Sequence, residues 1–249
     1  MDLDRALGVA LQAAGGARSA IAALRGATVE WKADGSEVTG ADRAAEQAIR
    51  QVISAAFPEH AIVGEEFGGS AASEWTWLVD PIDGTISFVH GVPLYATLIA
   101  LCRNHEPVVA VVDLPGLDRQ LHAVTGHGAW EGSRRIQVSP GFDTHASLVA
   151  RGDRYQFVAA GRLPLYQRLD VELRLFRTYA DAHGHCLVAS GAAALMVDPD
   201  LRPWDIAAPS LIVREAGGRV LALPEPSGKV TAISGNAEAL AWLEPRLQG

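Results

Sequence analysis

Two carboxylates lie three residues apart where an apolar run ends. Asp80 and Asp83 belong to the segment Asp-Pro-Ile-Asp-Gly-Thr at residues 80–85, which directly follows Trp-Thr-Trp-Leu-Val at residues 75–79. Crowded carboxylates raise one another's pKa unless a cation compensates their charge. Mg²⁺ prefers hard oxygen ligands of this kind and usually sits between one or two carboxylates and a phosphate group. The pattern therefore predicts a divalent-cation site at the end of a strand.

The residues between and after the two acids predict a tight turn. Pro81 fixes one φ angle, and Gly84 allows the backbone to approach another group closely. If Thr85 begins a helix, the free N–H groups of residues 84–86 would point at an anion. A polar turn with a helix cap would explain such a motif equally well if it stood alone.

Three other acidic segments accompany this motif. Ile-Val-Gly-Glu-Glu at residues 62–66 is an apolar run that ends in acids, Asp205 stands in Trp-Asp-Ile-Ala-Ala at the start of a helical pattern, and Asp42 precedes another helix. Together with Glu-Ala-Gly-Gly at residues 215–218, these segments resemble, in sequence and in order, the inositol monophosphatase superfamily of Mg²⁺-dependent phosphatases. The resemblance covers nearly the whole chain.

The resemblance implies a set of metal ligands and two or three Mg²⁺ ions per site. The ligands are the side chains of Glu65, Asp80, Asp83 and Asp205 and the backbone carbonyl of Ile82. Asp80 would bridge two ions, Glu65 would complete one ion site, and Asp83 with Asp205 would complete the other. Two neighbouring metal ions can neutralise a phosphate, activate a water and stabilise the leaving oxygen. The residue types agree independently, because all of them are hard oxygen donors.

The resemblance also implies how the attacking water is held. The water would lie near Glu65 and Thr85, and the Thr85 hydroxyl would be oriented by Asp42. Asp42 could instead only cap its helix, which is a common use of aspartate, and the two roles are compatible. Glu66 could interact with the residues that bind the metal without binding it itself, or it could bind a weaker third ion. Lys32 could approach the phosphate as a point charge or be a solvated loop lysine.

Two further acids bear on the substrate. Histidinol-phosphate phosphatases of this superfamily tend to have Gly-Asp after Arg-Thr, and then a Val-Asp-Pro segment before Trp-Asp-Ile-Ala-Ala. This chain has Asp181 and Asp198 in those places. Surplus carboxylates suit a cationic ammonium or imidazolium group. We therefore expect Asp83, Gly84, Thr85, Asp181 and Asp198 to bind a small phosphate ester, with histidinol phosphate as the leading candidate.

The chain also departs from that pattern. Ala180 replaces the usual glycine, and Ile86 stands where such enzymes often carry lysine. An inositol or broad sugar monophosphatase is therefore the alternative, and a regulatory binding role is an alternative of another class. His183 and His185 are two residues apart, so on a helix they do not face the same way. We interpret them as surface residues or as support for the site, and not as a metal-binding pair.

Composition excludes several classes of protein. The formal net charge of −8 argues against nucleic acid as the main partner, and no uncharged stretch is long enough to span a bilayer. Two isolated cysteines, Cys102 and Cys186, predict buried free thiols. The N-terminus lacks the order of regions that marks a signal peptide, so we expect a cytoplasmic location. The resemblance implies a homodimer that acts on a small phosphorylated metabolite.

Hydrophobic patterning predicts an antiparallel sheet in the first part of the chain and an α/β layer in the second. The resemblance implies that the two halves form an α+β / α/β layered sandwich of alternating helix and sheet layers, with the site between them. Residues 1–143 are expected to form an α+β half with an antiparallel sheet and most of the metal ligands, and residues 144–249 an α/β half that completes the site. Helices are predicted at 3–25, 42–57, 153–168, 184–195, 205–216 and 236–246. Strands are predicted at 61–63, 75–80, 94–102, 107–113, 119–124, 147–150, 175–178, 219–222 and 230–233.

Overall fold

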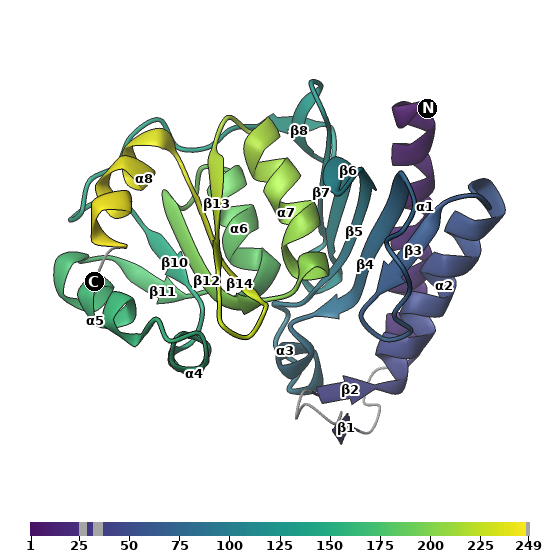
Figure 1. Ribbon diagram of the computed structural model, residues 1–249, viewed down its shortest axis with the longest axis horizontal. Helices are drawn as coiled ribbons and strands as arrows, with labels where there is room; N and C mark the ends of the chain where they lie inside the picture. Colours follow the sequence, from purple (N-terminus) through teal and green to yellow (C-terminus); the bar gives the residue numbers. More distant parts are fainter. Residues whose placement is uncertain (25–28, 32–36, 248–249) are drawn as a thin grey trace.

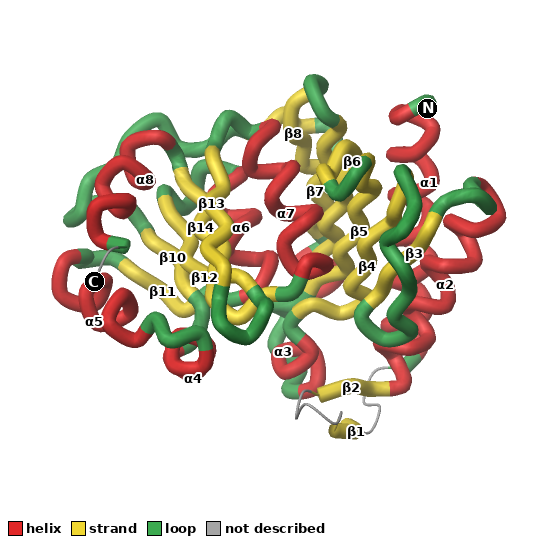
Figure 2. The backbone as a smooth tube through the Cα atoms, in the orientation of Figure 1, coloured by secondary structure: helices red, strands yellow, loops and turns green. Residues whose placement is uncertain are grey.

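The computed structural model describes residues 1–24, 29–31 and 37–247. Within these residues two large sheets alternate with three layers of helices (Figure 1). The helices are α1 (Leu3–Ala23), α2 (Gly40–Ala56), α3 (Thr85–Val89), α4 (Arg154–Ala159), α5 (Leu163–Glu172), α6 (Asp181–Ala189), α7 (Pro203–Glu215) and α8 (Ala237–Leu243). Figure 2 shows the same layers by type of structure. The predicted layered fold class is confirmed.

The larger sheet has the strand order β3-β4-β5-β6-β7-β8-β9. Its strands are β3 (Ala61–Gly64), β4 (Trp75–Asp83), β5 (Ala96–Arg103), β6 (Glu106–Leu114), β7 (Arg119–Val124), β8 (Gly128–Glu131) and β9 (Arg134–Ile136), and the 3₁₀ turn η1 (Pro115–Leu117) connects β6 to β7. The prediction of a wholly antiparallel sheet is wrong at one pair, because β3 runs parallel to β4. The loop between β3 and β4 returns the chain to the end of the sheet at which β3 begins, so the C-terminal ends of both strands lie at the same end of the sheet.

Helices α1 and α2 cover the outer face of this sheet (Figure 1). The fully buried residues of α1 are mostly alanines, such as Ala10 and Ala14, and Leu7 is only half-buried. Small side chains let the two helices approach closely. A Cβ atom built on Gly16 would be 3.8 Å from the Ala48 Cβ. Helix α1 continues through the adjacent glycines Gly15 and Gly16 without a break.

The smaller sheet has the order β11-β10-β12-β14-β13. Its strands are β10 (Val149–Arg151), β11 (Phe176–Thr178), β12 (Leu195–Leu201), β13 (Arg219–Pro224) and β14 (Val230–Gly235). A short hairpin, β1 (Val29–Trp31) with β2 (Glu37–Thr39), lies apart from both sheets. Strand β12 was not predicted, and the predicted helix at residues 184–195 overlaps it only at Leu195. That helix ends at Ala189, where Gly191 has a φ of 77° and turns the chain.

Two other predicted helices have different bounds. The predicted helix 153–168 is divided into α4 and α5 at Gly161, whose φ is 69°. Helix α8 ends at Leu243 and is followed by the 3₁₀ turn η2 (Glu244–Arg246), which includes a proline. Helices α4, α5 and α8 cover the outer face of the smaller sheet (Figure 1).

Helices α6 and α7 lie between the two sheets. Helix α7 contacts strands β4 to β8 of the larger sheet as well as β13 and β14 of the smaller one. The division into two domains at residue 143 therefore stays a prediction. Cys102 and Cys186 are both buried and free, as expected, and burial raises the pKa of each thiol to about 12. None of the described helices is both long and apolar enough to cross a membrane.

Candidate functional site

The end of strand β4 carries the first two acids of the candidate site. The strand continues to Asp83, three residues beyond its predicted end, and its pairing with β5 becomes irregular between Asp80 and Asp83. Thr97 of β5 donates a hydrogen bond to the Pro81 carbonyl at 2.8 Å, and the Ile82 amide donates to Asp80 Oδ1 at 3.0 Å. Both carboxylates are buried. The irregular strand end holds the two acids at fixed positions.

The turn after β4 leads into α3 and contacts helix α2 through a hydrogen bond. Gly84 has a φ of 80°, and Thr85 is the first residue of α3. The Thr85 hydroxyl lies 3.3 Å from Asp42 Oδ1 and 3.0 Å from the Ile82 carbonyl oxygen. The other oxygen of Asp42 accepts from the Thr39 amide at 2.8 Å and from its hydroxyl at 2.6 Å. Asp42 is the third residue of α2, not its first, and it contacts both the helix cap and Thr85.

Glu65 follows strand β3 and lies next to the end of β4. Gly64 pairs in register with Val79, and the Glu65 amide donates to the Val79 carbonyl at 3.1 Å. The parallel pairing therefore brings Glu65 beside Asp80, although fourteen residues separate them in the sequence. The site thus depends on the one strand pair whose direction was predicted wrongly.

Two acids from the C-terminal half approach the same turn. Asp205 lies in the first turn of α7, and its Oδ2 accepts from the Arg202 amide at 2.7 Å. At the start of α6, the Ala182 amide donates to Asp83 Oδ2 at 2.7 Å. A Cβ atom on Gly84 would be only 3.0 Å from Asp181 Oδ2. The helices between the sheets therefore bring the two halves of the site together.

The pKa values of four carboxyl groups in this cluster, Asp80, Asp83, Asp181 and Asp205, are raised. Burial raises the pKa of Asp80 most, followed by the charge of Glu65 and then that of Asp83. For Asp83, burial is again the first cause and the charge of Asp181 the second. Mainly through burial, the pKa reaches about 7 at Asp205 and about 8 at Asp181. The acids lie close enough to repel one another, and a bound cation would relieve that repulsion.

The donor set fits Mg²⁺ in its chemistry and charge. Asp80, Asp83 and Asp205 each use one oxygen to accept a backbone N–H, and the second oxygen of each has no donor among the described residues. These are hard oxygen donors in a region of excess negative charge. Within the described part of the chain, however, no three acidic, histidine or cysteine side chains are already grouped closely enough to hold an ion. Ligand roles for these residues and Ile82 therefore stay predictions.

Asp198 and His185 form a buried pair near the acids. Both Asp198 oxygens and His185 Nε2 lack hydrogen-bond partners among the described residues, and Nε2 lies 3.6 Å from Oδ2. His185 Nδ1 is 2.7 Å from the Ser234 hydroxyl. His183 is also buried, so the interpretation of these two histidines as surface residues is wrong. Burial, followed by the charge of Arg119, lowers the pKa of His183.

Two more results concern residues outside the main cluster. Lys32 lies outside the described residues. Sequence reasoning missed Glu46, which is buried on α2 and contacts the loop that carries Glu65 and Glu66. The available signal was its spacing, because Glu46 follows Asp42 by one helical turn and shares its face.

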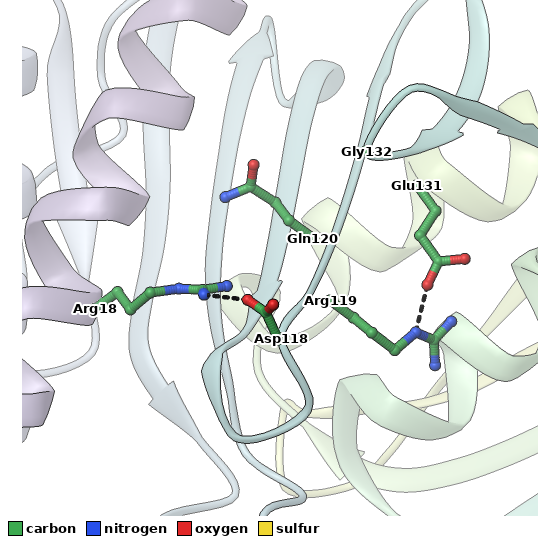
Figure 3. Close-up of a pocket in the computed structure, with 6 residues that line it drawn as sticks. All are labelled: Arg18, Asp118, Arg119, Gln120, Glu131 and Gly132. Atoms are coloured by element: carbon green, nitrogen blue, oxygen red, sulfur yellow. Dashed lines mark hydrogen bonds and ion pairs between the residues drawn. The ribbon is translucent and has the colours of Figure 1, made fainter.

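A surface pocket of about 490 Å³ contains none of the predicted site residues (Figure 3). Its lining residues are Arg18, Asp118, Arg119, Gln120, Glu131 and Gly132. Arg18 pairs with Asp118, and Arg119 pairs with Glu131, so the arginines in this pocket already have acidic partners. We therefore place the candidate site at the acid cluster and not in this pocket.

Comparisons with known proteins agree with the geometry. Residues 2–247 match the Inositol monophosphatase family. The chain is 39% identical over 233 residues to a histidinol-phosphatase of Streptomyces coelicolor, with 88% of each chain covered. It is 34% identical over 216 residues to a fructose-1,6-bisphosphatase/inositol-1-monophosphatase of Aquifex aeolicus, covering 84% of this chain and 80% of that one.

The fold is also found among solved structures. The crystal structure of the extragenic suppressor protein suhB from Bartonella henselae superposes with a TM-score of 0.88 at 29% identity, and 98% of each chain is covered. The family match and the fold match each cover almost the whole sequence. The chain belongs to the inositol monophosphatase family and is a phosphatase.

Proposed function

We propose that this phosphatase hydrolyses histidinol phosphate to histidinol and phosphate and depends on Mg²⁺. The observation that carries the proposal is the presence of two acids, Asp181 and Asp198, beyond those that metal binding requires. The charge of Asp198 is the largest charge effect on the pKa of Asp181, so the two lie near each other. A substrate with a cationic end would compensate them. The name of the Streptomyces relative supports the same substrate.

The phosphate end would be held mainly by the N-terminal half, with Asp205 contributed by the C-terminal half. Glu65, Asp80, Asp83, Asp205 and the Ile82 carbonyl would hold the metal. Bound Mg²⁺ would neutralise the phosphate, lower the pKa of an attacking water and stabilise the leaving oxygen. The first-turn amides of α3 have no partner within the helix and can donate to the phosphate.

Thr85 would hold the attacking water. Its hydroxyl has one proton, which it can donate to Asp42 or to the Ile82 carbonyl, and its lone pairs can accept from water. Asp42 would fix the rotation of that hydroxyl, and Glu65 would accept the proton of the water. Burial is the main cause that raises the pKa of Asp42, and the hydrogen bonds from Thr39 oppose it.

The test of the metal requirement compares the protein before and after chelation. Phosphatase activity should disappear with a chelator and return with added Mg²⁺. Asp80→Asn should reduce kcat by several orders of magnitude, because this residue would contact both ions. Full turnover in metal-free buffer would contradict the proposed role of Mg²⁺.

The substrate is tested with Asp198→Asn and two phosphate esters. The change should reduce kcat/KM for histidinol phosphate about ten- to a hundred-fold, because one charge-assisted hydrogen bond contributes about 1.5–3 kcal/mol. Inositol 1-phosphate, which has no cationic end, should be affected much less. Asp113→Asn is the matched control, since Asp113 is equally buried but pairs with Arg18.

An inositol or sugar phosphate is the second candidate. The side chain of Ile86, in α3 next to Thr85, is 58% exposed and places an apolar group where a lysine was expected. Ala180 is the other departure, and the name of the Aquifex relative supports this candidate. Equal or faster turnover of inositol 1-phosphate by the unmodified protein would show that these departures were the better guide.

A further inference from the structure

Glu46 is a fully buried carboxylate whose partners lie in the loop after strand β3. It lies on α2, and its side chain reaches the segment that follows Glu65. Glu46 Oε2 accepts from the Glu66 amide at 2.7 Å, and Oε1 accepts from the Phe67 amide at 3.3 Å. A buried carboxylate that accepts two loop amides fixes the course of that loop, because leaving these groups unpaired is costly.

Arg50 completes the attachment from the next turn of α2. Its Nε donates to Glu46 Oε1 at 2.7 Å, and a terminal guanidinium nitrogen donates to the Gly68 carbonyl at 2.5 Å. Gly64 and Gly68 also exchange both of their backbone hydrogen bonds, at 3.1 and 3.0 Å. The first part of the loop is therefore closed on itself between Gly64 and Gly68 and is held against α2 at residues 66–68.

The sequence at Gly64 matches this arrangement. A Cβ atom there would lie 2.1 Å from Glu46 Oε1 and 2.4 Å from its carboxyl carbon. Gly64 is not among the residues with positive φ, so backbone conformation does not require glycine. Space for the Glu46 carboxylate is the reason that this position has no side chain.

We propose that Glu46 is a positioning residue that places Glu65 for metal binding. Glu46 and Asp42 lie one helical turn apart, so α2 holds the Glu65 loop with one acid and Thr85 with the other. The helix thereby sets the distance between the group that would bind the metal and the group that would hold the water. This inference rests on the proposed role of Glu65 as a metal ligand.

The first experiment titrates Mg²⁺ alone into the substrate-free protein by calorimetry. Glu46→Gln keeps the shape of the side chain, but its NH₂ group must then face Arg50 or a loop N–H. Mg²⁺ affinity should fall about tenfold or more, as for other residues that orient metal ligands. At saturating Mg²⁺, KM should be unchanged. Asp113→Asn, which also removes a fully buried charge next to an arginine, should leave Mg²⁺ affinity unchanged.

The second variant reaches the same contact from the loop. Gly64→Ala keeps Glu46 but forces its carboxylate and the loop apart, so it should weaken Mg²⁺ binding in the same way. Gly40→Ala is the control for Gly64→Ala. Gly40 lies on α2, as Glu46 does, and a Cβ atom there would have no atom within 4 Å. Hydrogen exchange of the Glu66 and Phe67 amides should accelerate in both test variants and in neither control.

The outcomes separate the two proposals. If the unmodified protein binds no Mg²⁺, the proposed metal dependence fails, and amide exchange alone then decides whether Glu46 fixes the loop. If the unmodified protein binds Mg²⁺ but folded Glu46→Gln and Gly64→Ala bind it equally well, Glu46 has only a structural role. A lower melting temperature without a change in Mg²⁺ affinity would also overturn the inference.

Discussion

Each oxygen of the Asp42 carboxylate has its own partner. Oδ2 accepts from Thr39 and completes the cap of α2, whereas Oδ1 faces the Thr85 hydroxyl. The sequence left open whether Asp42 caps a helix or orients Thr85, and the structure contains both contacts. Its role in holding water stays a prediction, and it depends on Thr85.

We expect Thr85→Ala to lower kcat by about 10²-fold, because a small misplacement of a reacting group is enough for such a loss. KM should change little, since the proposed metal and phosphate contacts remain. Steady-state kinetics of Thr85→Ser, which retains the hydroxyl, provides the control. Near-normal kcat in the alanine variant would leave Thr85 with only a structural role at the start of α3.

At the scale of elements, helix α6 is placed by a glycine. A Cβ atom on Gly184 would lie 2.3 Å from the Tyr179 carbonyl oxygen and 2.5 Å from Met196 Sδ. The absence of a side chain lets α6 pack directly on strand β12, and the start of α6 then meets Asp83 through the Ala182 amide. The position of Asp181 relative to Asp83 thus depends on how closely this helix packs.

Gly184→Ala should lower the free energy of unfolding by about 1–3 kcal/mol, because overpacking outweighs the gain in helix propensity. It should also reduce activity, since α6 carries Asp181. Gly8→Ala is the matched control. Gly8 lies on the exposed side of α1, and a Cβ atom there would have no atom within 4 Å, so the change should stabilise the protein by up to about 1 kcal/mol. Denaturant unfolding measures the free energy of unfolding of both variants. Equal changes in Gly184→Ala and Gly8→Ala would contradict close packing at Gly184.

At the scale of the whole molecule, folding gathers acids that the unfolded chain keeps apart. The raised pKa values mean that the folded, metal-free protein holds protons that the unfolded chain has already released. Their contribution to stability is complete below a pH of about 4 and is lost as the pH rises through the folded pKa of about 7 for Asp205 and about 8 for Asp181. Above that range the acids repel one another as carboxylates.

We therefore expect the melting temperature in chelator to fall between about pH 5 and about pH 9, more steeply than in Asp205→Asn. Added Mg²⁺ should raise the melting temperature, and the increase should be larger at the higher pH, because a ligand that binds only the folded state stabilises it. Thermal unfolding followed by circular dichroism is the measurement. An increase that is the same at both pH values would argue against relief of charge repulsion.

Local patterns predicted much of the fold and candidate site. The acids at the ends of apolar runs, the mostly antiparallel larger sheet and the helix–strand alternation of the C-terminal part follow from nearest neighbours in the sequence, because turn residues and hydrophobic periods act over a few positions. The stacking of the layers was expected from the family resemblance. The buried, free state of the two cysteines was predicted from their isolation in the sequence and is confirmed. Ligand, catalytic and substrate roles stay predictions, since they depend on groups that bind from outside the chain.

Other features were decided only by tertiary structure. The parallel direction of β3, the strand β12 and the burial of His183 and His185 result from packing between distant segments, which no local pattern encodes. Glu46 is the clearest case, because its spacing from Asp42 places it on the same face of the helix but does not show which groups its carboxylate contacts. Only when α2 packs on the larger sheet does its carboxylate meet the Glu66 and Phe67 amides beside Gly64. The chain specifies which chemical groups are present, and the packing of layers determines which of them meet.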